Sequence, residues 1–211
     1  MPDRVDLPCI YVLAGVNGAG KSSLAGAMFM EQHVDCFDPD VAARRILEAN
    51  PGIKQREANS VAWFEGKRLL KRAIAERLNF AFETTLGGRT IASLLEAAAV
   101  AGTTVRVWYV GLKTPELHIA RVRSRVARGG HDIPEDQIRA RYVASRLNLI
   151  RILPHLAELR MFDNTEEADP AAGATPNPRL ILHMTRGKVV KSCKLPETPD
   201  WAKPILATAL M

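Results

Sequence analysis

Residues 15–22 constrain what this chain can fold into more than any other segment. They read Gly-Val-Asn-Gly-Ala-Gly-Lys-Ser and fit the pattern G-x-x-x-x-G-K-[ST] without a gap. The nearly all-apolar residues 8–14 before them are typical of a central parallel strand covered on both faces, and a helix is expected from about residue 21 to residue 32. A strand, a glycine-rich turn and a helix in this order predict a phosphate-binding loop, or P-loop, rather than a chance glycine-rich turn.

The residues of this loop have expected tasks in binding ATP. Glycines let backbone N–H groups turn inward around phosphate oxygens, and the N-terminal dipole of the following helix adds to the attraction. Lys21, expected to face solvent, would place its charge on the β- and γ-phosphates, and the Ser22 hydroxyl would bind Mg²⁺. The predicted nucleotide-binding residues are Gly15, Val16, Asn17, Gly18, Ala19, Gly20, Lys21, Ser22 and Ser23.

Strands and helices alternate along the rest of the 211 residues. Strands are predicted at 34–37, 80–82, 104–110 and 159–162, and helices at 41–50, 57–78, 90–101 and 115–153, the last interrupted at Gly129-Gly130. Residues 169–178 indicate a surface loop, and residues 179–190 a terminal hairpin. The alternation predicts a single α/β domain over residues 1–211, with a mostly parallel sheet and helices on both faces.

The composition limits the partners and the compartment. Apolar runs fall short of the roughly 20 residues that a membrane span needs, and the N-terminus lacks the pattern of a signal peptide. Cys9, Cys36 and Cys193 lack metal-ligand spacing, which favours a cytoplasmic protein with reduced thiols. The net charge of +6 fits nucleic acid, an anionic membrane or polyanionic small molecules. We favour small molecules over nucleic acid, because the chain has no long lysine run and no RNA-binding aromatic signature.

Acidic residues follow two of the predicted strands. Asp38 and Asp40 close the second strand, and Glu83 closes the third, followed by Thr85 and Arg89. Ligands of open α/β folds bind at this edge of the sheet, where one carboxylate can accept a proton from an attacking hydroxyl and another can orient the substrate. The alternatives are structural, since Asp40 could be only a helix N-cap and Glu83 only a surface strand end.

Together these segments resemble the bacterial zeta-toxin-like P-loop kinases. The resemblance spans about residues 8–165 and is greatest to the chromosomal branch. It rests on the P-loop, Phe37-Asp38-Pro39-Asp40, Phe80-Ala81-Phe82-Glu83-Thr84-Thr85-Leu86, residues 129–135 (Gly-Gly-His-Asp-Ile-Pro-Glu) and residues 138–142 (Ile-Arg-Ala-Arg-Tyr). We therefore expect an adenylate-kinase-like P-loop fold with a helical lid at about residues 115–150 and a C-terminal hairpin and tail at 179–211.

The resemblance also implies a reaction. Characterised zeta toxins use ATP to phosphorylate the 3′-hydroxyl of the sugar in UDP-N-acetylglucosamine, and an antitoxin protein holds them. It implies that Asp40 accepts the hydroxyl proton and that Glu83 and Thr85 lie in the substrate site, to which we add Asp38 and Arg89. The branch usually carries Asn at the position of Asp38, so two carboxylates compete for the role of base. Chloramphenicol phosphotransferases and other small-molecule kinases have related folds, so the acceptor stays open.

Arginines gather on both sides of Gly129-Gly130. They are Arg121, Arg123, Arg125, Arg128, Arg139, Arg141 and Arg146, and positions 121, 125 and 128 share one helix stripe. Planar guanidinium groups suit a phosphoryl group in flight, and the two glycines could form the hinge of a closing lid. The predicted catalytic residues are Asp40, Lys21, Arg121, Arg128 and Arg141. The alternative is a solvated basic helix whose arginines pair with Glu116, Glu135 and Asp136.

Asn164 follows the fifth predicted strand and could either read the adenine base or serve as a turn residue. The resulting prediction is a kinase that transfers the γ-phosphoryl group of ATP to a hydroxyl of a small molecule. One alternative is a kinase for another metabolite or an antibiotic. A second is an ATPase or switch that acts on a macromolecule, which has less support because residues 104–110 end in Gly111 rather than in Asp.

Overall fold

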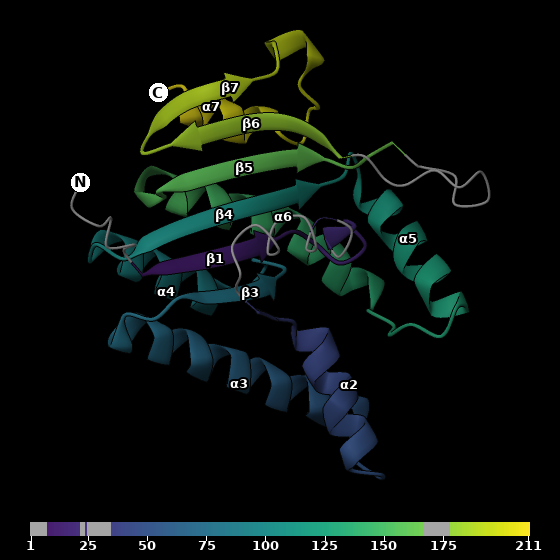
Figure 1. The fold of residues 1–211 in the computed structure, drawn as a ribbon. Helices are drawn as coiled ribbons and strands as arrows, with labels where there is room; N and C mark the ends of the chain where they lie inside the picture. The colour runs from purple at the N-terminus through teal and green to yellow at the C-terminus, as the bar shows by residue number, and fades with distance from the viewer. Residues whose placement is uncertain (1–7, 22–23, 25–34, 167–177) are drawn as a thin grey trace.

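A seven-stranded sheet forms the centre of the molecule (Figure 1). The computed structural model describes residues 8–21, 24, 35–166 and 178–211. Across the sheet the strands are β2 (Cys36–Phe37), β3 (Phe80–Thr84), β1 (Cys9–Ala14), β4 (Thr104–Gly111), β5 (Glu158–Asp163), β6 (Arg179–Thr185) and β7 (Lys188–Ser192). The first five of these run parallel, and β6 and β7 add an antiparallel hairpin. The predicted α/β class and the mostly parallel sheet are confirmed.

Strand β1 lies in the middle of the parallel part because its sequence is apolar on both faces. Ile10, Val12, Leu13 and Ala14 are fully buried. Its register against β3 pairs Leu13 with Glu83, so the carboxyl ends of the two strands lie side by side. The residues that follow both strands therefore meet at one edge of the sheet.

The helices are α2 (Pro39–Ala49), α3 (Gln55–Glu76), α4 (Arg89–Val100), α5 (Pro115–Ala127), α6 (Glu135–Ile152) and α7 (Lys203–Ala209), with short 3₁₀ turns at Leu153–His155 and Leu195–Glu197. Figure 1 shows α2 and α3 as an arm beside β3, and α5 beyond the carboxyl ends of the strands. The helices predicted from residue 41 to residue 153 are confirmed within a few residues. Most of the helix predicted at 21–32, and nearly all of the loop predicted at 169–178, fall outside the described residues.

Proline and glycine lie at several helix boundaries. Pro39 and Pro115 occupy first-turn positions, where the missing N–H costs nothing, and Gly129 adopts φ +84° just after α5. None of the described helices combines the length and the apolar composition of a bilayer-spanning segment.

The C-terminal part, whose motifs the sequence did not reveal, packs onto the end of β4. Trp201 is 3% exposed, and its ring lies so close to Gly111 that a Cβ there would approach it to 2.4 Å. The indole Nε1 donates to Asp163 Oδ1 at 3.1 Å. Gly111 is thus required by packing.

Candidate active site

The P-loop follows β1 in a conformation that its glycines make possible. Gly15, Gly18 and Gly20 have φ values of +147°, +79° and +85°. A Cβ on Gly18 would come within 2.6 Å of the His118 carbonyl oxygen of α5, so the loop also needs glycine for this close approach. The backbone here curves between β1 and the lid, which we define as residues 115–150.

Lys21 is buried rather than facing solvent, so that expectation was wrong. The residue is 6% exposed, and its Nζ donates to the carbonyl oxygens of Gly15 and Val16 at 2.7 and 3.4 Å. It also lies 3.4 Å from Glu83 Oε1. The parallel pairing of β1 with β3 brings the two side chains together, and the loop carbonyls hold the ammonium group inside the curve of the P-loop. Ser22 and Ser23, predicted to bind Mg²⁺ and nucleotide, lie outside the described residues.

Glu83 has an altered acidity in this position. Burial raises the pKa of its carboxyl group, the nearby Lys21 charge opposes that rise, and the negative charges of Asp38 and Asp40 add to it. The three carboxylates therefore interact electrostatically beside the P-loop. Such a group can accept a proton or orient a cationic or hydroxyl-bearing ligand.

Asp38, not Asp40, is the N-cap of α2. Its Oδ1 accepts hydrogen bonds from the backbone N–H groups of Asp40 and Val41 at 2.8 and 3.3 Å. Asp40 is left free of the capping task, and its Oδ2 lies 3.8 Å from Arg125 Nη1. The alternative that Asp40 is only a helix N-cap is therefore wrong, because Asp38 already caps the helix two residues earlier.

Two lid arginines reach this group of acids. Arg125 contacts Asp40 and donates from Nη2 to the His131 carbonyl oxygen at 2.8 Å. Arg141 donates from Nη1 to Asn17 Oδ1 of the P-loop at 2.8 Å. Burial lowers the pKa of the Arg141 guanidinium, and the Asp40 charge opposes that shift. Arg125 was part of the predicted stripe but not of the predicted catalytic set.

The other predicted arginines are placed differently. Arg128 donates to the Ser124 carbonyl oxygen of its own helix at 3.2 Å, and Arg89 is exposed at the first residue of α4. Arg121 is half-buried on α5, close enough to His118 for its charge to affect that ring. The solvated-helix alternative does describe two others, since exposed ion pairs join Arg123 to Glu135 and Arg139 to Glu116.

Thr85 shapes the turn after β3. Its Oγ1 accepts from the Gly87 backbone N–H at 3.3 Å, and its carbonyl oxygen accepts from the Ser145 hydroxyl at 2.7 Å. Gly87 lies against the Arg141 side chain, so closely that a Cβ there would approach Cγ to 2.7 Å. The turn that carries the predicted substrate residue Thr85 thus supports the arginine that contacts the P-loop.

Two buried side chains brace the P-loop itself. Asn164, 3% exposed, donates from Nδ2 to the Ala19 carbonyl oxygen at 2.9 Å, which is a positioning contact on the loop. His118, which the sequence analysis missed, has its Nδ1 2.9 Å from the Asn17 carbonyl oxygen. Burial lowers its pKa to about 4, and the charges of Lys21 and Arg121 act in the same direction. A lone histidine on a basic helix gives no sequence signal of this role.

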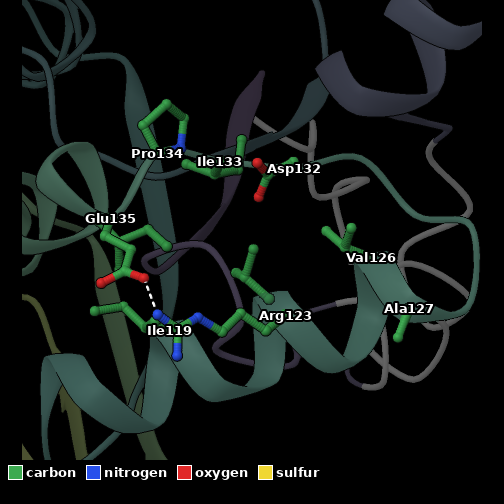
Figure 2. A pocket seen from close by; sticks show the side chains of 10 residues that line it. Ile119, Arg123, Val126, Ala127, Asp132, Ile133, Pro134 and Glu135 are labelled. Atoms are coloured by element: carbon green, nitrogen blue, oxygen red, sulfur yellow. Dashed lines mark hydrogen bonds and ion pairs between the residues drawn. The ribbon is translucent and has the colours of Figure 1, made fainter.

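A cavity of about 450 Å³ lies on the lid, between α5 and residues 132–135 (Figure 2). Figure 2 shows the Arg123 side chain running along α5 to meet Glu135 at its rim. Ile119 and Val122 line it and also pack against Val16 of the P-loop. The lining includes none of the described P-loop residues, so the cavity belongs to the lid and not to the nucleotide site.

The side chains near the P-loop suit a Mg²⁺ ion only if substrate phosphates and water supply its other ligands. The described residues contain no group of three or more His, Cys, Asp or Glu side chains that could hold a metal ion by themselves. Mg²⁺ usually keeps several waters and binds through one or two protein groups together with substrate phosphates. The coupled carboxylates Asp38, Asp40 and Glu83 fit that arrangement.

The fold and this loop define an α/β protein of the P-loop class. The zeta toxin family model matches residues 1–168, and the chain belongs to the zeta toxin family. A relative in Haemophilus influenzae, an uncharacterised protein, is 34% identical over 129 residues, which cover 61% of this chain and 88% of the relative.

Solved structures share the fold at low sequence identity. A chain of the AvrRxo1-ORF1:-ORF2 complex with ATP superimposes with a TM-score of 0.68 and 16% identity, over 96% of this chain and 64% of that one. This chain therefore spans less than two thirds of that protein's length. A chain of the PezAT chromosomal toxin–antitoxin system of Streptococcus pneumoniae gives a TM-score of 0.55 and 18% identity, over 76% of this chain and 69% of the other.

Proposed function

We propose that this protein transfers the γ-phosphoryl group of ATP to a hydroxyl group of a small molecule, with UDP-N-acetylglucosamine as the leading acceptor. The observation that carries the proposal is the group of carboxylates beside the P-loop lysine. Glu83 pairs with Lys21, and its carboxyl group interacts with Asp38 and Asp40. A carboxylate beside the transferred phosphoryl group can take the proton of an attacking alcohol.

Each residue has a task in this proposal. Lys21 and the P-loop backbone bind the phosphates, and when phosphate oxygens are present they replace the Gly15 carbonyl as partners of the ammonium group. Asp40 accepts the proton of the attacking hydroxyl, which is supported by its release from capping. Glu83 and Thr85 orient the acceptor. Mg²⁺ would be held with Ser22 and the carboxylates, and it would neutralise charge on the transferred group.

Arg125 and Arg141 supply positive charge from the lid side. Both guanidinium groups interact with Asp40, and Arg141 also contacts the P-loop side chain of Asn17. Arginines in such positions stabilise the charge on the equatorial oxygens of the phosphoryl group more in the transition state than in the ground state. An antitoxin protein is proposed as a partner, because the PezAT neighbour belongs to a toxin–antitoxin system and the AvrRxo1-ORF1 neighbour is in a complex with ORF2. A cytoplasmic location also remains part of the proposal.

The test is phosphoryl transfer from radiolabelled ATP to a panel of acceptors. UDP-N-acetylglucosamine, free N-acetylglucosamine and chloramphenicol would each be offered to the wild-type protein and to the Lys21→Ala variant. We expect label on UDP-N-acetylglucosamine with the wild type only. Label on chloramphenicol alone would show that chloramphenicol, and not UDP-N-acetylglucosamine, is the acceptor. If ATP is hydrolysed at the same rate with and without the acceptors, and no acceptor carries label, the proposed kinase function is refuted.

A further inference from the structure

The arm formed by α2 and α3 carries an exposed tryptophan beside the proposed active site. Trp63 is 40% exposed on α3, which leaves a large part of its ring accessible to a ligand. The core of the arm does not need it, because α3 packs on α2 through Ala58 and Ala62 instead.

The contacts of neighbouring residues on α3 show where Trp63 lies. Asn59, one turn before Trp63, has its Nδ2 3.3 Å from Nε2 of His131 in the lid. Gly66, three residues after Trp63, lies against Phe37, so closely that a Cβ would approach the ring to 2.6 Å. Since residues at these spacings lie on neighbouring parts of one helix face, Trp63 stands between a lid contact and the residue that precedes Asp38.

The ring is held in place by its own helix. Phe64 packs edge-on against it with a centroid distance of 5.0 Å, and Lys67 Nζ lies 4.7 Å from its centroid. A tryptophan fixed in this way has little conformational freedom left to lose when a ligand stacks on it. Lys67 also places a positive charge next to the ring, which favours a ligand that carries an anionic group.

From these contacts we infer that Trp63 is a specificity-determining residue, which binds the phosphoryl acceptor by stacking against a flat or apolar ring of it. The inference rests on the proposed function, because it assigns the acceptor to the space between α3, the lid and the carboxylates. It goes beyond that proposal in assigning a residue of α3, outside the carboxylates and the lid, to the binding of the acceptor ring. Acceptors without a ring lose this contact.

The chain supplies a matched control in Phe64. Both side chains are exposed aromatics on one helix, but consecutive positions point about 100° apart, and Phe64 is away from Asn59 and Gly66. Trp63→Ala, Trp63→Phe and Phe64→Ala would be titrated with UDP-N-acetylglucosamine by calorimetry. The nucleotide site would be saturated beforehand with a non-hydrolysable ATP analogue. Titrations with UDP and with N-acetylglucosamine distinguish a stacked base from a stacked sugar.

Loss of a stacked ring weakens binding by about tenfold or more. We expect this loss in Trp63→Ala, substantial recovery in Trp63→Phe, and a clearly smaller loss in Phe64→Ala, which removes only the edge contact that supports the Trp63 ring. Wild-type affinity in Trp63→Ala, an equal loss in Phe64→Ala, or no binding by the wild type would each overturn the inference. Binding without phosphoryl transfer would instead refute the proposed function and leave the role of Trp63 standing.

Discussion

At the scale of single residues, the pairing of Lys21 with Glu83 links stability to activity. Lys21 is almost completely buried, and Glu83 is the nearby carboxylate whose pKa is raised by burial. A loop lysine that faced solvent could be removed without consequence for the fold. A lysine that neutralises a buried carboxylate cannot, because its loss leaves an uncompensated charge.

Lys21→Met should therefore abolish phosphoryl transfer and also lower the free energy of unfolding, by about 3 kcal/mol at neutral pH. A carboxyl group whose pKa is raised in the folded state favours folding only while it is protonated. This contribution to stability is lost as the pH rises through the pKa of the folded state. Removal of Lys21 raises this pKa further. The difference in the free energy of unfolding between Lys21→Met and wild type should thus become smaller in acid, where Glu83 is protonated. Urea unfolding at several pH values measures it, and a pH-independent deficit, or none, contradicts this account. The double variant with Glu83→Gln should recover most of it.

Asp38 and Asp40 differ in task although they are two residues apart. Asp38→Asn should keep the α2 cap, since Asn caps as well as Asp, and should change stability by less than about 0.5 kcal/mol. Transfer should persist, because the family branch usually carries Asn there. Asp40→Asn should bind ATP and lose transfer, because an amide cannot accept the proton. Nucleotide affinity and turnover, measured on both variants, decide the assignment. The reverse pattern would make Asp38 the base.

At the scale of elements, α5 presents its arginines to different surroundings. Arg125 reaches Asp40 and the His131 carbonyl, whereas Arg128 bonds only to the Ser124 carbonyl among the contacts that the structure describes. Arg125→Glu should therefore reduce turnover about a hundredfold or more, as the loss of one transition-state contact does, while ATP affinity changes less. Arg128→Glu serves as the matched control on the same helix. Equal turnover in the two variants would show that the basic stripe is only a solvated face.

Local sequence predicted the elements well and their contacts poorly. The unbroken apolar run of β1, the glycine turn after it and the proline at the start of α5 are local signals, and each had the expected result. The burial of Lys21 was missed because its partner Glu83 arrives from another strand. The task of Asn164 on the P-loop backbone depends in the same way on the sheet order. Helix α7 has only seven residues, and its buried Ile205 and Leu206 belong to the same core cluster as Trp201, so tertiary packing accounts for it.

At the scale of the whole molecule, the lid is anchored at its base and joined to the opposite arm at its tip. Val16 packs with Ile119 and Val122 of α5, and His118 contacts the Asn17 carbonyl, so the base of the lid and the P-loop form one unit. Near its tip, Arg125 meets Asp40 of α2, and His131 meets Asn59 of α3. Closure over a ligand can therefore depend on the segment around Gly129-Gly130 without movement of the whole lid.

Amide hydrogen exchange tests this division of the lid. Without ligand, amides of residues 127–134 should exchange rapidly, because they lie in a turn with few buried contacts, while those of residues 117–122 and 141–149 should be protected by the core. ATP with acceptor should slow exchange in the turn by about tenfold or more, since the contacts of Arg125 and His131 then stabilise the closed arrangement. Asn59→Ala should weaken that slowing and leave the base unchanged, because it removes the α3 side of the tip contact only. Uniform exchange along the lid, or equal slowing of base and tip, would mean that the lid closes as one rigid body and that Gly129-Gly130 is only a helix terminus.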